Sequence, residues 1–241
     1  MNINYEHIVN YLNNIYIDED FLDLKNYGND NNIPIMKLET KEFLKQLVII
    51  QKPKNILEIG TAIGYSSLLF SKYTDASITT IEKSKKMYEI AKSNFKKYKK
   101  DINIINMDAK KALNNINQGF DFVFIDANKS QYEYYFNKAL SLLNKNGIIV
   151  CDNILFRGQI TNDNIINKRD ITIVKNLRKF LSHITNLDDY VTSIIPIGDG
   201  ISISTRRIDE RQSWIISTSG WYGKIKNSNK VWGRSCLYGW K

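Results

Sequence analysis

The spacing of apolar residues in the first quarter of the chain predicts helices. Between residues 4 and 17, apolar side chains recur every three or four positions, which is the spacing of one face of an α-helix. A second helix is expected to begin at Asp18-Glu19-Asp20 and to end near Gly28. A third is expected over residues 38–51 and stops before Pro53. These helices form an N-terminal segment, residues 1–54, ahead of a differently patterned core.

From residue 55 onward, short apolar runs alternate with longer amphipathic stretches. Seven runs are predicted strands, at residues 56–60, 77–81, 102–107, 120–125, 147–151, 190–197 and 201–204, and the predicted helices between them cover residues 65–73, 83–100, 109–116, 130–143 and 171–185. This alternation predicts an α/β fold with a mainly parallel, seven-stranded, Rossmann-like sheet and helices on both faces. The last two runs are joined by Gly198-Asp199-Gly200, which predicts a C-terminal antiparallel hairpin at the edge of the sheet.

The distribution of charge changes this picture only near the C-terminus. The 241 residues have a formal net charge of +9, but residues 211–241 contain six basic residues and no acidic one. The remaining 28 basic and 25 acidic residues nearly balance, so charge by itself is weak support for a polyanionic partner. We therefore expect one domain over residues 1–208, with its core at 55–208, followed by an atypical basic tail at 209–241.

That tail also contains all four tryptophans and keeps neither a helical nor a strand period. Three interpretations remain open: an accessory strand pair, an aromatic and basic arm for RNA, or translation past a natural stop near Arg206 or Arg207. Elsewhere the chain has no apolar run of the roughly 20 residues that a membrane span needs. The N-terminus lacks the pattern of a secretory signal, and Cys151 and Cys236 are not in C-x-x-C spacing. We therefore expect a cytoplasmic protein.

A glycine turn after the first predicted strand is the first candidate for a binding site. In N-I-L-E-I-G-T-A-I-G-Y-S, residues 55–66, the dinucleotide fingerprint G-x-G-x-x-G would require glycine at Gly60, Ala62 and Tyr65, and only the first is glycine. Glu58, two residues earlier, would repel a pyrophosphate but could hold an amino group. The turn therefore favours a nucleoside with a charged amine, such as S-adenosylmethionine, and the alternative is a tight turn that binds nothing.

Two further acids follow the next strands of the predicted sheet. Glu82 ends the second strand, where an acid can accept hydrogen bonds from ribose hydroxyls. Asp108-Ala109 follows the third strand and could contact an adenine ring. Asp108 could equally cap the following helix, and both roles are compatible.

The residues after the fourth and fifth strands predict a metal site. Asp126 ends one strand, and Asp152-Asn153 ends its neighbour, so their oxygens converge at one edge of the sheet, where strands lie about 4.8 Å apart. Two carboxylates and one amide favour Mg²⁺, with Mn²⁺ or Ca²⁺ possible. Lys129, three residues after Asp126, could accept a proton from a substrate. The alternatives are that the two acids cap loops and that the lysine is solvated.

Taken together, these motifs resemble the cation-dependent O-methyltransferases, the family of caffeoyl-CoA and catechol O-methyltransferases. The resemblance covers about residues 33–204 and is carried by four pieces of sequence: Leu57-Glu58-Ile59-Gly60 with Gly64-Tyr65-Ser66, Asp126-Ala127-x-Lys129-x-x-Tyr132, Asp152-Asn153 followed by Gly158, and Gly198-Asp199-Gly200. Within the family the chain looks most like the bacterial branch that methylates 5-hydroxyuridine in tRNA. The short 153–158 loop and the Ile33-Pro34-Ile35-Met36 segment suggest that branch.

The resemblance implies a class I S-adenosylmethionine-dependent methyltransferase fold and a set of site residues. The cofactor would be bound by Met36, Glu58, Gly60, Ser66, Glu82, Asp108, Ala109 and Asp126. The cation would be held by Asp126, Asp152 and Asn153, and the catalytic residues would be Lys129 and Asp126. The family's usual second acid in Asp-Ala-Asp is Asn128 here. A homodimer is also implied.

The leading hypothesis is an enzyme that methylates a tRNA anticodon base, converting 5-hydroxyuridine to 5-methoxyuridine. Six cations could meet the RNA backbone: Lys37, Lys41, Lys45, Arg157, Lys168 and Arg169. The alternative is the same reaction on a small catechol-like or caffeoyl-CoA-like metabolite. A non-catalytic S-adenosylmethionine- or RNA-binding protein would have no use for a metal and a base, and Ala62 and Tyr65 disfavour an NAD-dependent dehydrogenase.

Overall fold

The computed structural model describes residues 5–17, 19–163 and 167–207. The tail at 209–241 lies outside these residues, so its three interpretations remain predictions. The three N-terminal helices are α1 (Glu6–Ile15), α2 (Leu22–Asp30) and α3 (Leu38–Gln51). Helix α2 begins later than expected because Phe21 has a left-handed backbone, with φ 50°, that separates Glu19 and Asp20 from the helix.

The core contains the seven expected strands in one sheet. They are β1 (Asn55–Ile59), β2 (Ser77–Glu82), β3 (Asn103–Asn106), β4 (Phe120–Ile125), β5 (Leu143–Cys151), β6 (Tyr190–Ile195) and β7 (Ile201–Arg206), in the order β3-β2-β1-β4-β5-β7-β6. Strands β1 to β5 pair in parallel, whereas β7 is antiparallel to both β5 and β6. This is the strand arrangement that the resemblance to class I S-adenosylmethionine-dependent methyltransferases implied.

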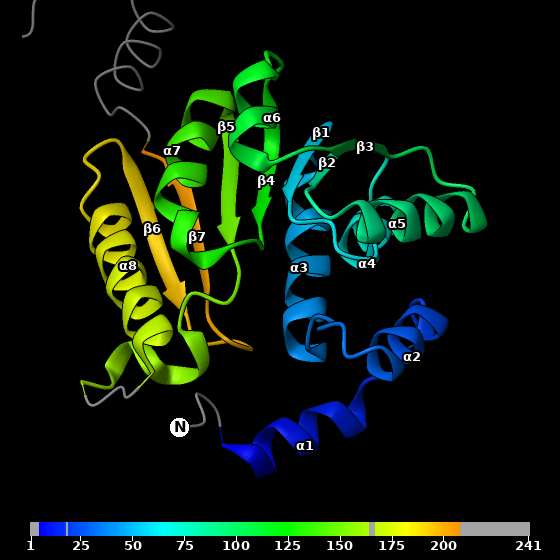
Figure 1. Cartoon of the computed structure of the whole chain (residues 1–241), viewed down its shortest axis with the longest axis horizontal. Coiled ribbons are helices and arrows are strands. Elements are labelled where there is room, and N and C mark those ends of the chain that lie inside the picture. The colour runs from blue at the N-terminus through cyan, green and yellow to red at the C-terminus, as the bar shows by residue number, and fades with distance from the viewer. Residues whose placement is uncertain (1–4, 18, 164–166, 208–241) are drawn as a thin grey trace, which may run out of the picture. The chain divides into compact units, whose positions relative to one another are not determined.

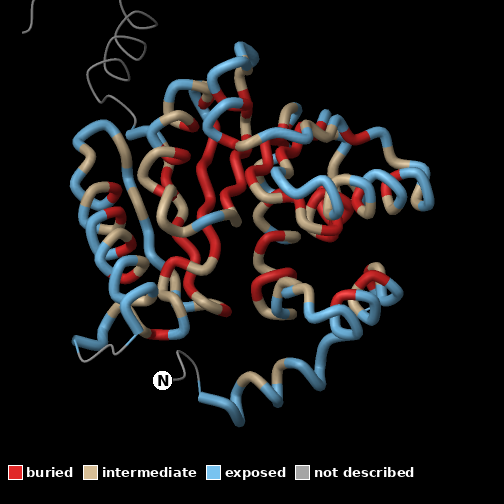
Figure 2. The backbone as a smooth tube through the Cα atoms, viewed as in Figure 1, coloured by how far each residue is buried: buried red, intermediate tan, exposed pale blue. Residues whose placement is uncertain are grey.

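Helices cover both faces of the sheet, as Figures 1 and 2 show. They are α4 (Tyr65–Tyr73), α5 (Lys85–Lys97), α6 (Ala109–Asn115), α7 (Tyr132–Leu142) and α8 (Lys168–Thr185). Alternate strand residues enter separate cores: Leu57 and Val123 pack with α6, α7 and α8, and Ile56 and Phe122 pack with α3, α4 and α5. The continuous apolar runs of β1 and β4 are therefore explained by burial on both faces.

The C-terminal half departs from the sequence expectation in three details. The hairpin lies at the edge of the sheet as predicted. Its second strand, β7, pairs with β5, so β6 is the outermost strand. After β5 there is a 3₁₀ segment, η2 (Phe156–Thr161), which is interrupted at Arg157 and Gly158. Helix α8 begins at Lys168, three residues earlier than expected, and Asn167 caps it by accepting a hydrogen bond from the Arg169 amide. Strand β5 begins at Leu143, four residues early, and pairs with β4 through an irregular register.

A buried cluster of charged side chains ties the N-terminal helices to the core. The Asp20 carboxylate accepts hydrogen bonds from Lys41 (3.1 Å), Lys72 and Tyr73. Burial by itself would raise the pKa of Asp20, but the hydrogen bonds from Lys72 and Lys41 outweigh it and lower the pKa to about 2. Lys41 is only 1% exposed, so the expectation that it meets an RNA backbone is wrong: its charge is used to hold α3 against Asp20.

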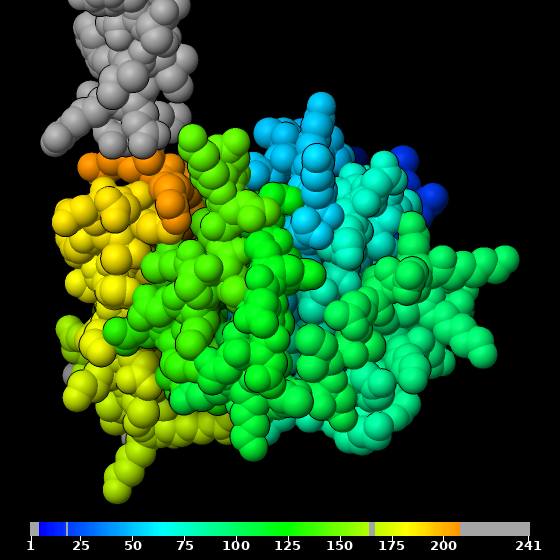
Figure 3. Space-filling model, turned by 90° about the horizontal axis from the view of Figure 1, so that it is seen from above, coloured from blue at the N-terminus to red at the C-terminus, as the bar shows by residue number. Residues whose placement is uncertain are grey.

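The segment around helix α5, residues 83–100, carries the net positive charge of residues 1–207. Eight lysines and one glutamate lie within residues 83–100, whereas residues 1–82 and 101–207 together contain 20 basic and 22 acidic residues. Apolar residues such as Ala91 and Phe95 face the sheet, and the lysines form the outer face, from which long side chains project in Figure 3. Within the described part of the chain, no helix is long and apolar enough to cross a membrane.

Candidate active site

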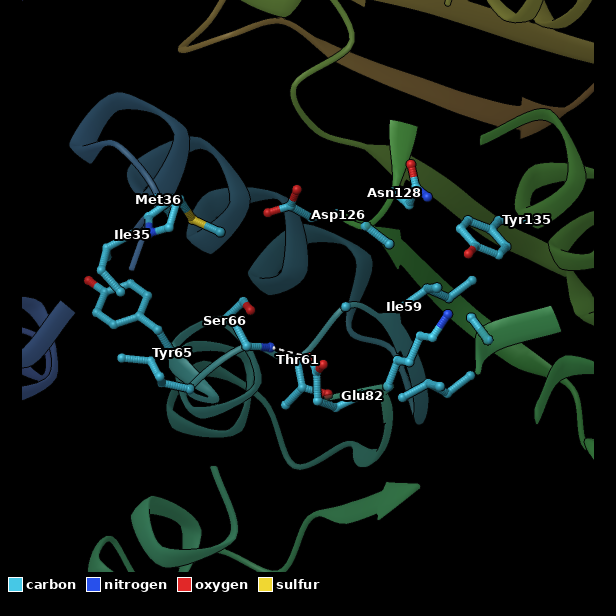
Figure 4. Close-up of a pocket in the computed structure, with 18 of the residues that line it drawn as sticks. Ile35, Met36, Ile59, Thr61, Tyr65, Ser66, Glu82, Asp126, Asn128 and Tyr135 are labelled. Carbon is cyan, nitrogen blue, oxygen red and sulfur yellow. Dashed lines mark hydrogen bonds between the residues drawn. The ribbon is translucent and has the colours of Figure 1, made fainter. Parts of the chain in front are cut away.

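A cavity of about 260 Å³ opens at the carboxyl ends of β1, β2 and β4 (Figure 4). Its wall includes seven of the eight residues expected at a cofactor site: Met36, Gly60, Ser66, Glu82, Asp108, Ala109 and Asp126. Backbone hydrogen bonds hold these strand ends together, since the Gly60 amide donates to Ile81 and the Asp126 amide donates to Ile59, each over 3.0 Å. Segments that are distant in the chain therefore form one cavity.

Gly60 is required where β1 ends. Its φ of +103° favours glycine, and a Cβ there would lie 2.0 Å from the carbonyl oxygen of Asp126. A side chain at this position would therefore separate the ends of β1 and β4. The glycine thus allows the turn after β1 and the segment that begins at Asp126 to lie side by side in the cavity wall.

Glu58 does not line the cavity, contrary to the expectation that it contacts the cofactor. Its side chain is fully buried beneath the turn, where its carboxylate accepts hydrogen bonds from Ser66, Ser67 and Thr80 (2.6 Å for Thr80). Burial raises the pKa of Glu58 to about 7, although the three hydroxyl groups partly oppose that rise. The residue points to the α4 side of the sheet because strand side chains alternate between faces, so it supports the turn from below.

Glu82 lies in the cavity wall and also fixes the glycine turn. One carboxylate oxygen accepts a hydrogen bond from the Ala62 amide at 2.9 Å, and the other accepts one from the Ser84 amide at 2.7 Å. Each carboxylate oxygen has a second acceptor site, so ribose hydroxyls could still donate to this side chain. The acid therefore both shapes and lines the pocket.

Asp108 caps a helix and also lies in the cavity wall, whereas its contact with an adenine ring remains a prediction. Its carboxylate accepts a hydrogen bond from the Lys110 amide at 3.0 Å and so caps α6, and it also lines the cavity. A hydrogen bond from Lys83, at 3.1 Å, lowers the pKa of Asp108. The acid is therefore held ionised beside Ala109, at the end of the cavity formed by β2 and β3.

Sequence reasoning missed several residues of the cavity wall. Tyr65, Lys83 and Tyr135 line it in addition to the expected residues. Figure 4 shows Met36, Tyr65 and Ser66 on one side of the cavity and Tyr135 on the other. Tyr135 comes from α7, which is placed here only by tertiary packing, so nothing in its local sequence marked it.

Asp126, Asp152 and Asn153 converge as the sequence predicted. The Asn153 side-chain amide donates to Asp126 at 3.2 Å, and the Asp152 carboxylate accepts a hydrogen bond from the Asn153 backbone amide at 2.6 Å. Burial, together with the Asp126 charge, raises the pKa of Asp152 to about 7, and burial also raises the pKa of Asp126. Two neighbouring carboxylates repel each other when both are ionised, and a bound cation would stabilise both negative charges.

Lys129 supplies a positive charge next to this pair. Its charge opposes the rise in pKa of both Asp126 and Asp152, and its ammonium group lies 6.0 Å from the centre of the Tyr132 ring. Asn128, which replaces the family's usual acid, lines the cavity and accepts hydrogen bonds from the Ser130 amide and hydroxyl. It therefore caps the 3₁₀ turn η1 (Lys129–Gln131), which positions Lys129.

The loop at 153–158 and the turn between β6 and β7 complete this side of the site. Asn153, Phe156, Arg157 and Gly158 all have positive φ, a conformation that is unfavourable for the three non-glycine residues. The charge of Asp199, in the turn, acts on both Asp126 and Asp152, so it also faces the pair. Among the described residues, no group of three or more His, Cys, Asp or Glu side chains could hold a metal, so an ion here would depend on the Asn153 amide.

Comparisons with known proteins agree with this geometry. The O-methyltransferase family model matches residues 14–208. A caffeoyl-CoA O-methyltransferase from Populus kitakamiensis is 30% identical over 196 residues, covering 76% of this chain and 82% of that protein. The Arabidopsis thaliana tapetum-specific methyltransferase 1 is 31% identical over 194 residues, covering 77% and 83%.

Solved structures give the same result. The SAH-bound methyltransferase PaMTH1 from Podospora anserina is 26% identical, with a TM-score of 0.76 over 84% of this chain and 95% of that one. The Bacillus cereus O-methyltransferase in complex with SAH is 25% identical, with a TM-score of 0.73 over 83% and 97%. SAH is the product that S-adenosylmethionine leaves after methyl transfer. The chain therefore belongs to the O-methyltransferase family and is an S-adenosylmethionine-dependent O-methyltransferase of the caffeoyl-CoA O-methyltransferase type.

Proposed function

We propose that this enzyme methylates one of two adjacent oxygens on a small acceptor and needs a divalent cation to do so. The observation that carries the proposal is the Asp126–Asp152 pair, with Asn153 between them, next to the cofactor cavity. This group of oxygen atoms supports a cation that both the protein and the acceptor bind.

The donor atoms fit a hard divalent ion. Asp126, Asp152 and Asn153 offer only oxygen ligands, and Asp152 is 4% exposed. Oxygen-only sites suit Mg²⁺, Mn²⁺ or Ca²⁺ rather than zinc. When bound, such an ion would lower the pKa of an acceptor hydroxyl, so that the oxygen can act as a nucleophile near neutral pH.

The chain's own residues account for alignment and proton transfer. Ser66, Glu82 and Asp108 would fix the methyl donor along the cavity, with Met36 over it, so that its methyl group faces the Asp126 side. Alignment is the main requirement of an in-line methyl transfer. Lys129 would accept the proton of the acceptor hydroxyl. Three protein ligands leave room on a six-coordinate ion for two acceptor oxygens, which favours catechol-like compounds.

Relatives named for caffeoyl-CoA favour a small acceptor over tRNA. The tRNA hypothesis keeps a specific basis, because Lys37, Arg157, Lys168 and Arg169 are exposed and could meet phosphates. Lys41 does not support this hypothesis, because it is buried in an ion pair with Asp20. Lys45 supports it less than expected, because it forms an ion pair with Glu42. We therefore keep 5-hydroxyuridine in the tRNA anticodon as the second candidate acceptor.

The decisive experiment offers the purified full-length enzyme both acceptor classes. Labelled S-adenosylmethionine and MgCl₂ would be incubated with caffeoyl-CoA, with simple catechols, and with tRNA that carries 5-hydroxyuridine, each with and without EDTA. We expect EDTA-sensitive transfer to a catechol-type acceptor. Transfer to tRNA alone would favour the second candidate, and transfer that is unaffected by EDTA would contradict the metal mechanism.

A homodimer also remains a prediction. Helix α1 has no buried residue, and its apolar side chains include Ile8, Tyr11 and Ile15, which are 46%, 66% and 56% exposed. A second copy of the chain could cover this face. Light scattering coupled to size-exclusion chromatography would test this expectation, and a monomeric mass at micromolar concentration would contradict it.

A further inference from the structure

We infer that Asp199 is a positioning residue that holds the 153–158 loop, and with it Asn153, in the geometry needed to bind a divalent cation. The inference rests on the proposed cation site, but the contacts that carry it belong to the loop and to the turn between β6 and β7. They were not expected from the sequence, where the Gly198-Asp199-Gly200 run indicated only a hairpin.

Three backbone amides of the 153–158 loop donate hydrogen bonds to the turn between β6 and β7. The Ile154 amide donates to the Gly200 carbonyl at 3.0 Å, and the Leu155 amide donates to the Asp199 carbonyl at 2.9 Å. The Arg157 amide then donates to the Asp199 carboxylate. Two of these contacts use backbone atoms that any residue has, so the carboxylate is the part that depends on side-chain identity.

The loop needs such a restraint because its own backbone conformation is unfavourable. Phe156 and Arg157 have φ values of 46° and 54°, and Asn153, the metal-ligand candidate, has a φ of 59°. Non-glycine residues keep this conformation only where the surroundings impose it. Without the Asp199 contact, we expect the Arg157 end of the loop to relax toward negative φ and to carry Asn153 away from Asp126.

The turn is itself held firmly. Gly200 packs so closely that a Cβ there would lie 2.2 Å from Leu155 Cγ, and Gly198 lies against the side chain of Thr40 in α3, which is 2% exposed. The turn thus contacts both the 153–158 loop and the start of α3. A rigid support of this kind can transmit its position to Asn153.

The test compares three single variants of the full-length protein. Asp199→Ala removes the acceptor of the Arg157 amide, whereas Asp199→Asn keeps an acceptor oxygen and removes only the charge. Asp189→Ala, at an exposed acid immediately before β6, is the matched control. Mn²⁺ affinity would be measured by electron paramagnetic resonance, and SAH affinity by calorimetry.

We expect Asp199→Ala to weaken Mn²⁺ binding by about tenfold or more, the effect typical of residues that support metal ligands. Asp199→Asn should stay within about threefold of the wild type, and Asp189→Ala should be unchanged. SAH affinity should be retained in all three proteins, which shows that they are folded. Wild-type Mn²⁺ affinity in Asp199→Ala would overturn the inference, and so would equal losses in the Asn and Ala variants, because charge would then be the cause.

A second measurement is independent of the metal. Trypsin cleavage after Arg157, followed by mass spectrometry, reports how well the loop is held. We expect cleavage at this site to be about tenfold faster in Asp199→Ala than in the wild type, and Gly200→Ala to behave similarly because its Cβ would displace Leu155. Equal cleavage rates in all variants would contradict the inference. If the wild type itself bound no Mn²⁺, the proposed function would fail, while the cleavage rates would still test the contact.

Discussion

Asp20 and the Asp126–Asp152 pair are carboxylates in buried surroundings whose pKa values move in opposite directions. Asp20 is met by Lys41, Lys72 and Tyr73, and its pKa falls to about 2. Asp152 is met by a second carboxylate, and its pKa rises to about 7. The first cluster already contains its compensating cations, whereas the cation that acts on the second, among the residues the structure describes, is Lys129. Burial therefore does not distinguish a structural acid from a functional one, but the charge of the neighbouring side chains does.

Glu58 is a third case that sharpens this contrast. It is buried as completely as any residue in the structure, yet its partners are hydroxyl groups rather than charges. Its pKa rises to about 7 because hydroxyls cannot replace the hydration of a full negative charge. A buried acid with neutral partners supports the fold most effectively when it is protonated.

The largest expected effect comes from removing a carboxylate of the pair. Asp152→Ala should lower methyl transfer by at least about a thousandfold, or about 4 kcal/mol in the activation free energy, because the cation would lose one of two charged ligands. SAH affinity should change little, since Asp152 is not in the cavity wall. Steady-state kinetics and calorimetry would measure both. Asp163→Ala, an exposed acid after η2, is the control, and an active Asp152→Ala enzyme would break the comparison.

The next effect concerns stability rather than activity. Asp20→Asn should lower the free energy of unfolding at pH 7 by about 3 kcal/mol, because it leaves Lys41 buried without its ion-pair partner at Asp20. The folded pKa of Asp20 is below the unfolded value, so its contribution is present above pH 3.8 and is lost as the pH falls through about 2. Urea unfolding at pH 7 and pH 3 would measure this.

The stability gap between wild type and Asp20→Asn should therefore narrow at the lower pH. Asp75→Asn, an exposed acid after α4, provides the control for a general charge effect. A gap that stays constant with pH would mean that packing, rather than the ion pair, explains the stability of this cluster.

A substitution of Lys129 tests whether the cation beside the pair takes part in the reaction. Lys129→Ala should lower the rate at neutral pH by roughly a hundredfold and shift the pH–rate profile to higher pH, where hydroxide can replace a missing base. The exposed Lys145→Ala variant should leave the profile unchanged. If Lys129→Ala kept the wild-type profile, Lys129 would be a purely electrostatic neighbour of the two acids.

The last effect is expected in the pH dependence of stability, and it comes from the buried acid with neutral partners. The folded pKa of Glu58 is raised, so its contribution to stability is complete below pH 4.5 and is lost as the pH rises through about 7. In the wild type, ionisation of Glu58 should lower the free energy of unfolding by up to about 1.4 kcal/mol per pH unit in this range. Glu58→Gln should abolish this part of the decline. Thermal unfolding at several pH values would show it, and an unchanged decline would assign that decline to Asp126 and Asp152.

Much of the fold was predictable because its signals are local. The apolar runs of β1 and β4 and the helical spacing of α3 and α4 specify those elements without distant contacts. Parallel strands with right-handed crossovers then leave few arrangements, so Gly60, Glu82, Asp108 and Asp126 were expected at one sheet edge before any contact was known.

The errors share a physical cause. Glu58 was assigned to the cofactor from its place two residues before a turn, but the alternation of strand side chains turns it beneath that turn. Lys41 was assigned to an RNA surface from its charge, yet Asp20, 21 residues earlier, makes it a buried ion pair. In both cases the sequence shows the charge of a residue and not the neighbours that stabilise it.

The sequence by itself therefore determined the order of strands and helices along the chain, the glycine turn after β1 and the oxygen-rich strand ends, because periodicity and strand-end position are local properties. Only the tertiary structure decided which acids are compensated, which residues of α7 reach the cavity, and how the β6–β7 turn holds the 153–158 loop. Those outcomes depend on contacts between segments far apart in the chain, such as Asp199 with Arg157, whose energies no local pattern records.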